Sequence, residues 1–205
     1  HLGTGFLRHP ANQALRERLR KEECTPANVK NQLMRLVYRM LFLFVAEDRE
    51  LLLDPKASTP ARERYRRYYS TARLRSLALG HGGSPHGDAW EQLRFLFRWL
   101  RTEQGCPELG LYCLGSQLFS AESCVDLEGA SLSNQYLYAA LRALCITRDG
   151  NLRRKTDFLH LGAEELGSVY ESLLELLPHI HGGDRFELAQ AQGNDRKLTG
   201  SYYTP

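Results

Sequence analysis

The amino-acid sequence predicts a mainly α-helical fold, an irregular helical domain with a small β-hairpin. Apolar residues recur at three- and four-residue steps over 31–53, which is the spacing of an amphipathic helix. Other segments with this spacing lie between capping residues and Gly or Pro stops. The run 145–161 carries Asp149-Gly150 between two short segments, a pattern typical of a hairpin with a tight turn. We therefore expect helices to build the core and one hairpin to be added to it.

The first two helices are expected before residue 54. Arg and Glu alternate over 12–23 around leucines at 15 and 19, which indicates a short solvated helix in an N-terminal arm, 1–30. The helix over 31–53 can begin at Thr25-Pro26, because Thr is a good N-cap and Pro suits the first helical turn. Asp54-Pro55 is expected to end it.

The middle of the chain predicts two more helices and one irregular stretch. The pattern over 62–79 is helical, with tyrosines on one side, and it ends at the glycine-rich loop 80–88. Asp88 can cap the next helix, whose apolar face carries Trp90 and Phe97 and which should stop near Pro107. The pattern loosens over 109–127, where we expect irregular structure with a short strand.

Two helices flank the expected hairpin. Ser133 can cap a helix through Leu144, and a helix over 163–177 has acidic residues in its first turn and ends at Pro178. These elements divide the chain into the arm 1–30, a helical scaffold domain 31–161 with its loop at 80–88, and a last helix and loop over 162–205.

Composition places the chain among ordinary globular proteins. It has 205 residues, of which 42% are hydrophobic and 25% charged, so disordered and collagen-like classes are excluded. The longest apolar stretch, 40–46, is far too short to span a bilayer, and no signal-peptide layout is present, so we expect no membrane partner and a cytoplasmic location. Five cysteines without a C-x-x-C pair favour reduced thiols, several of them buried. The net charge is only +3, but arginines cluster.

The segment 199–205, with the sequence TGSYYTP, has the features of a strand-to-helix ligand loop. Its glycine lets the backbone approach a ligand, its two rings can stack, and its proline suits the first turn of a helix. A simple chain terminus is the alternative interpretation. Read as a loop, its backbone and side chains would contact a zwitterionic amino-acid group.

Four segments in order carry a resemblance to one family. The first is 36–49, LVYRMLFLFVAEDR, followed by three leucines at 51–53; the second is Leu118-Phe119 after a loop. The third is 165–174, ELGSVYESLL, and the fourth is 199–205. Together they resemble large Eco57I-like restriction-modification methylases and the related phage-defence methylases. The third is similar to the helix that leads into their methyltransferase core, and the fourth to the motif that opens the S-adenosylmethionine site of gamma-class N6-adenine DNA methyltransferases.

The resemblance implies a function for a longer, multidomain protein. That function is methyl transfer from S-adenosylmethionine to the exocyclic amine of adenine in DNA, on a Rossmann-like core, after base flipping. This chain has no Asn-Pro-Pro-Tyr/Phe run and no glycine-rich loop after a strand, so we expect it to be inactive alone and not to bind the cofactor appreciably. Restriction or other defence-system subunits are implied as partners. The residues that the resemblance assigns to the cofactor site are Thr199, Gly200, Ser201, Tyr202, Tyr203, Thr204 and Pro205.

The stretch 62–75, in which arginines are interleaved with tyrosines, is the candidate DNA contact. Arginines can neutralise phosphates and the interleaved tyrosines can stack, although tyrosines at this spacing are also typical of a core face surrounded by arginines. The shorter run 153–155 beside the expected hairpin turn favours a solvated turn over a DNA contact. The candidate DNA-binding residues are Arg62, Arg64, Arg66, Arg67, Arg73 and Arg75.

The remaining chemical candidates favour structural interpretations. His179 and His181 with Asp184 lack a well-spaced third ligand and are expected at the surface of a loop. Glu47 and Asp48 are expected to form ion pairs at a helix end rather than to act in catalysis. No metal-dependent nuclease signature is present in the sequence.

Two other function classes remain open. A stand-alone DNA-binding module would use the Arg62–Arg75 face, and a stand-alone protein-interaction module would use the region of Trp90, Phe97 and Trp99.

Overall fold

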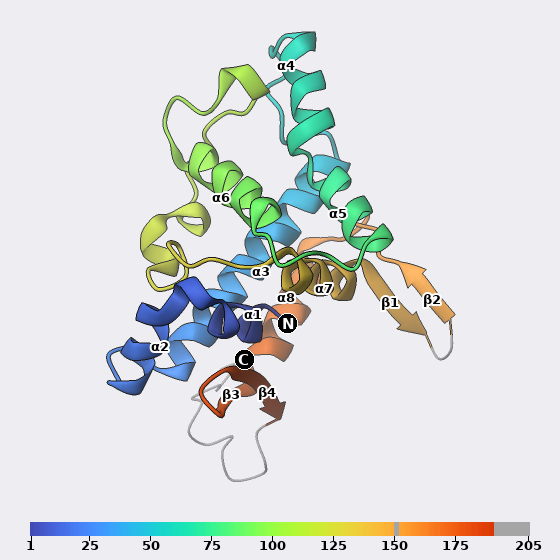
Figure 1. The fold of residues 1–205 in the computed structure, drawn as a ribbon. Helices are drawn as coiled ribbons and strands as arrows, with labels where there is room; N and C mark the ends of the chain where they lie inside the picture. Colours follow the sequence, from blue (N-terminus) through green and yellow to red (C-terminus); the bar gives the residue numbers. More distant parts are fainter. Residues whose placement is uncertain (150–151, 191–205) are drawn as a thin grey trace, which may run out of the picture.

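The computed structural model describes residues 1–149 and 152–190, and it is mainly helical with two separate two-stranded antiparallel sheets (Figure 1). The predicted fold class is therefore confirmed. None of the helices in these residues combines the length and apolar character needed to cross a bilayer. All five cysteines are free thiols, and only Cys113 among them is not fully buried, as expected.

The longest described helix, α3 (Pro26–Asp48), runs through the middle of the molecule and contacts α1, α5 and β3 (Figure 1). Thr25 caps it as expected: its hydroxyl accepts from the Asn28 backbone N–H, and the Asn28 side chain accepts from the Thr25 N–H. The helix ends at Asp48 and not at Asp54-Pro55, because Glu50 adopts a left-handed conformation with φ of 57°. The carbonyl of Ala46 then accepts from the Leu51 N–H.

Shorter helices surround α3. The N-terminal segment is solvated only in part, because Leu2, Phe6 and Leu7 of its first helix belong to the core and Phe6 packs edge-on against Trp90 at 5.4 Å. The expected stretch 12–23 contains α2 as a short helix. The helices with their bounds are α1 (Leu2–Arg8), α2 (Gln13–Arg20), α4 (Thr59–Arg64), α5 (Thr71–Gly80), α6 (Asp88–Arg101), α7 (Asn134–Cys145) and α8 (Ala163–Leu174), with 3-10 helices η1 (Pro10–Asn12), η3 (Pro107–Leu109), η4 (Gln117–Phe119) and η5 (Ala121–Cys124).

The prediction of a single helix over 62–79 is wrong, because the chain forms α4, a π-helical turn η2 (Tyr65–Tyr69), and α5. Ser70 is extended between η2 and α5, and its hydroxyl accepts from the Arg73 N–H as an N-cap. The carboxylate of Glu47 on α3 accepts from the backbone N–H groups of Thr71 and Ala72. Because these donors at the start of α5 are satisfied by a distant side chain, the break is stable although the local pattern is helical.

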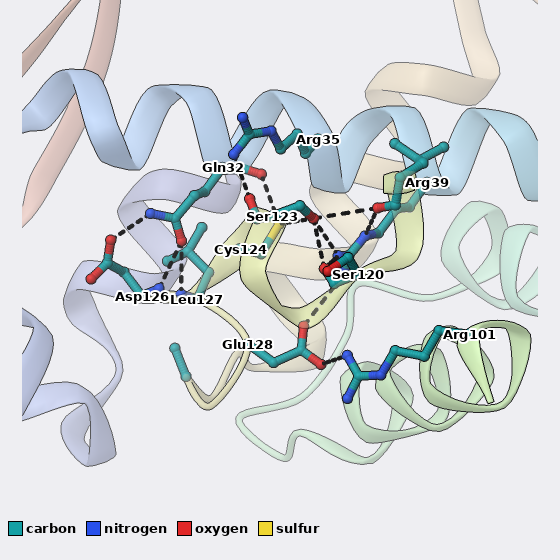
Figure 2. A network of polar contacts seen from close by, with 12 residues as sticks. Gln32, Arg35, Arg39, Arg101, Ser120, Ser123, Cys124, Asp126, Leu127 and Glu128 are labelled. Atoms are coloured by element: carbon teal, nitrogen blue, oxygen red, sulfur yellow. Dashed lines mark hydrogen bonds and ion pairs between the residues drawn. The ribbon is translucent and has the colours of Figure 1, made fainter. Parts of the chain in front are cut away.

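The stretch 109–127 is irregular as predicted, but the expected short strand is reduced to isolated bridges of Leu111 with Leu53 and Cys106. Arg39 on α3 holds the second half of this stretch (Figure 2). Its guanidinium is fully buried and donates to the carbonyls of Leu118 and Ser120, both at 2.7 Å, and to the hydroxyl of Ser123 at 2.8 Å. One buried cation therefore replaces the hydrogen bonds that regular structure would have supplied.

The expected strand pairing is confirmed as β1 (Ile146–Asp149) with β2 (Leu152–Lys155), and Gly150 of the expected tight turn lies outside the described residues. A second hairpin, β3 (Leu176–His181) with β4 (Arg185–Gln190), was not expected, and α8 ends at Leu174 rather than Leu177. Gly182 and Gly183 form its turn with positive φ of 62° and 79°.

The second hairpin packs against α1. The Thr4 hydroxyl accepts from the Phe186 N–H and donates to the Phe186 carbonyl, each at 3.2 Å. The ring of Phe186 lies over Gly3, where an added Cβ would come within 2.5 Å of it. A glycine on α1 is therefore what allows the close approach of β4.

Candidate nucleic-acid interface

The six arginines predicted to bind DNA fall into two groups. Three of them serve the fold. Arg62 donates to the carbonyls of Ala57 at 3.1 Å and Asp54 at 3.0 Å, and Arg64 donates to the carbonyl of Glu108 at 2.6 Å. These bonds attach α4 to the loop before it and to η3.

Of the six arginines, Arg75 is the one most fully engaged in contacts within the fold. It forms a two-bond ion pair with Asp48, and its guanidinium lies 5.0 Å from the ring centre of Phe44 and 5.1 Å from that of Phe158. Its side chain is only 13% exposed. The pair and the two rings bind the end of α3 to α5 and to the segment after β2, so Arg75 is a structural residue.

Arg66, Arg67 and Arg73 are the three exposed members that make at most weak contacts within the chain. Arg66 approaches Glu50 at 3.9 Å with both side chains exposed, and Arg67 lies over Tyr68 at 5.5 Å from its ring centre. Arg66 and Arg73 line a cavity of about 460 Å³ beside η2. Exposed pairs of this kind contribute about 0–1 kcal/mol, so these guanidinium groups are available to a polyanion.

The two acidic residues at the end of α3 behave differently from each other. Asp48 is ion-paired with Arg75, as expected for a helix end, whereas no ion pair with Glu47 is present in the described residues. The Glu47 carboxylate accepts from the Tyr65 hydroxyl at 2.6 Å and from the Thr71 backbone N–H at the start of α5. Burial, followed by the nearby Glu47 carboxylate, raises the pKa of Tyr65 well above its ordinary value. Glu47 is therefore a structural acceptor.

The basic run Arg153, Arg154 and Lys155 lies on β2 of the first hairpin and not on a turn, and all three side chains are exposed. Within the described part of the chain no carboxylate forms an ion pair with any of them. Arg153 also lines a groove of about 520 Å³ with Arg142 of α7. The sequence favours the Arg62–Arg75 face as the DNA contact, but in the structure the run 153–155 is at least as exposed as that face.

The histidines considered for a metal lie in β3. His179 and His181 are stacked at 6.3 Å between ring centres, but His181 pairs with Glu187 at 3.2 Å and Asp184 pairs with Arg8 at 3.2 Å. No group of three or more potential metal ligands occurs among the residues that the structure describes. The expected loop is thus a strand, and its polar groups are used to position the hairpin.

Three of the four segments that carry the methylase resemblance meet on α3. The second segment is held by Arg39 through the Leu118 carbonyl, and Phe119 packs edge-on against Phe42 at 5.7 Å. The third segment is α8, where the carbonyl of Leu166 accepts from the Tyr38 hydroxyl at 2.8 Å. The fourth, Thr199 to Pro205, lies outside the described residues.

No family model, curated protein or solved structure matches this chain. Any functional assignment therefore depends on the residues themselves and on how the fold arranges them.

Proposed function

We propose that this chain is a helical scaffold segment of an adenine-specific DNA methyltransferase of a restriction-modification or phage-defence system. The observation that supports the proposal best is the meeting of separate resemblance segments on α3. Residues 36–49 contact Leu118-Phe119 through Arg39 and Phe42, and contact α8 through Tyr38. Segments that are about 80 and 130 residues apart in sequence thus form one structural unit.

The role of this unit would be to fix the direction in which α8 leads toward a catalytic core. Tyr38 bonds the first turn of α8 through Leu166 and packs edge-on against Tyr170 at 5.4 Å. At the other end of α8, the Lys30 ammonium donates to the carbonyls of Leu174 and Leu176. Two points of attachment on α3, two helical turns apart, set both the position and the axis of α8.

S-adenosylmethionine would supply the methyl group in the longer protein. The described residues contain neither a glycine-rich loop between a strand and a helix nor an Asn-Pro-Pro run, and Thr199 to Pro205 lie outside them. What this chain's own residues contribute is therefore the placement of α8 and contact with the DNA backbone through exposed arginines, and calorimetry of the isolated chain with S-adenosylmethionine should give no measurable heat.

The test uses the protein encoded by the complete reading frame. Its expression in a strain without adenine methylation should produce N6-methyladenine in the host DNA, measured by mass spectrometry of nucleosides. The Tyr38→Phe variant removes the bond to α8 and should lower the level of methylation, while Tyr112→Phe, which removes an exposed hydroxyl bonded to Leu51, serves as control. A complete reading frame that lacks the strand-glycine loop and the Asn-Pro-Pro motif would refute the proposal.

A stand-alone DNA-binding module is the second candidate, and the exposed cations on η2, α5 and β2 favour it. The surface expected for a protein-interaction module is not exposed at Trp90 and Phe97, because these side chains are 2% and 1% exposed and lie in the core. Trp99 is half-buried against Phe95. Salt-dependent binding of duplex DNA without any methylation by the complete protein would favour the DNA-binding module.

A further inference from the structure

In the described part of the chain, the hydrogen bonds that attach the first hairpin, β1–β2, to the helical body lie at its base. The Thr156 backbone N–H donates to the Cys145 carbonyl and the Thr156 hydroxyl donates to the Leu144 carbonyl, both at 2.9 Å. Beyond this anchor the hairpin projects from the body beside α7 (Figure 1). Every residue of β2 is exposed, including Leu152 at 61%. A strand that buries nothing contributes little to the core, so its sequence is free to serve another purpose.

Arg153, Arg154 and Lys155 of β2 take part in no ion pair within the residues that the structure describes. Side chains alternate between the two faces of a strand, so Arg153 and Lys155 share one face and Arg154 lies on the other. Asp157, which follows β2, is bonded to His160 at 2.8 Å. An anionic ligand would therefore offset the charges of Arg153, Arg154 and Lys155.

A basic groove lies at the base of the ribbon. It has a volume of about 520 Å³ and is lined by His1, Ala139, Arg142, Ala143, Ile146 and Arg153, with no carboxylate among them. Arg142 donates to the carbonyls of Ala78 at 2.8 Å and His81 at 2.7 Å. Because these acceptors are neutral, Arg142 is held in place while its positive charge remains. The groove and the Arg153 face of the ribbon thus form one concave cationic surface.

We propose that the β1–β2 ribbon and the groove at its base bind the phosphate backbone of duplex DNA, with the ribbon in the major groove. A two-stranded ribbon fits a groove about 12 Å wide, and β2 extends for roughly 13 Å at 3.3 Å per residue. Arg153 and Arg142 contact phosphates at the mouth of the groove, and Lys155 and Arg154 reach the backbone on either side. This deepens the proposed function by naming its DNA contact, and it depends on that proposal only for the choice of DNA among polyanions.

The test compares three double variants that all change the net charge from +3 to −1, since each reversal removes two charges. Arg153→Glu/Lys155→Glu reverses one face of the ribbon. Arg66→Glu/Arg73→Glu reverses the exposed cations beside η2. Arg20→Glu/Lys21→Glu reverses two exposed cations at the end of α2 and is the matched control. Binding to a 25-base-pair duplex is measured by fluorescence anisotropy between 50 and 300 mM salt, and circular dichroism checks the fold.

If both ribbon residues contact phosphates, their reversal should reduce the slope of log affinity against log salt by about 1.8, which is about 25-fold in affinity over the sixfold range of salt. The α2 control should change affinity less than threefold. Equal losses in all three variants would show a net-charge effect and overturn the inference. A loss only on reversing Arg66 and Arg73 would overturn it while leaving a DNA contact for the proposed function. Tighter binding to single-stranded RNA of equal length would overturn the choice of duplex DNA. The absence of methylation by the complete protein refutes the proposed function separately and leaves these binding results intact.

Discussion

Replacing Arg39 with methionine should destabilise the protein by about 2–3 kcal/mol. The guanidinium makes direct bonds to the carbonyls of Leu118 and Ser120, and hydrogen bonds from a charged donor contribute about 1.5–3 kcal/mol each. Part of this loss of stability is offset, because the variant no longer has a cation to desolvate on folding, which contributes about 1–3 kcal/mol. Glu128 loses little, since it keeps its ion pair with Arg101 at 2.6 Å.

Urea denaturation followed by circular dichroism measures the effect. With an m value of roughly 2–3 kcal/mol/M, the midpoint of the Arg39→Met variant should fall by about 1 M at unchanged slope. Arg35→Met is the matched control on the same helix: Arg35 is exposed, makes one bond to the Ser123 carbonyl, and should change stability by no more than about 0.5 kcal/mol. A midpoint for Arg39→Met within 0.2 M of the wild type, on the order of the m-value error, would refute the view that this cation stabilises the irregular stretch.

Three further outcomes are expected. Glu47→Gln should lower stability by about 1–3 kcal/mol in thermal denaturation, because its amide group points a donor at the N–H groups that begin α5, and an unchanged melting temperature would contradict this. Gly3→Ala should release the second hairpin from α1 and speed hydrogen exchange of the Phe186 amide, since the new Cβ would lie 2.5 Å from the Phe186 ring. Burial, and then the bond to Asp126, raise the pKa of Cys24 from 9.0 to about 11. Unfolding therefore releases a proton above pH 9, and stability should fall between pH 9 and 11; Cys24→Ala should flatten that fall in urea titrations at several pH values.

The sequence predicted well where short-range chemistry decides the structure. Thr25, Pro26 and Asn28 start α3 through a capping box whose partners lie within three residues, and the heptad-like apolar pattern that follows is buried as expected. The first hairpin was predicted from Asp149-Gly150 for the same reason. In each case the residues that stabilise the element are neighbours in the chain, so a local pattern contains the information.

The secondary structure predicted from the sequence was wrong where a residue far away in the chain determines the local structure. The break at Ser70 depends on the Glu47 carboxylate of α3, and nothing within 62–79 reports that acceptor. Residues 175–177 fit the helical spacing, yet Leu176 and Leu177 pair with β4, which is stabilised by the contact of Phe186 with Gly3. The Gly182-Gly183-Asp184 turn is the local signal in the sequence for this second hairpin.

The function of a basic residue in this fold depends on whether an orphan carbonyl lies within its reach. Short helices and irregular stretches leave many carbonyls without partners, and long cationic side chains satisfy them here at helix ends and in loops. Such a cation is used by the fold, although in sequence it cannot be distinguished from a phosphate ligand. In the described residues no carbonyl accepts from the basic side chains of β2, and these side chains are exposed. Basic side chains that bond backbone carbonyls in this way include Arg16, Lys30, Arg35, Arg39, Arg49, Arg62 and Arg64. The density of arginine is therefore a poor guide to DNA contact in an irregular helical protein, and the cations of a projecting ribbon are better candidates than a larger cluster within the helices.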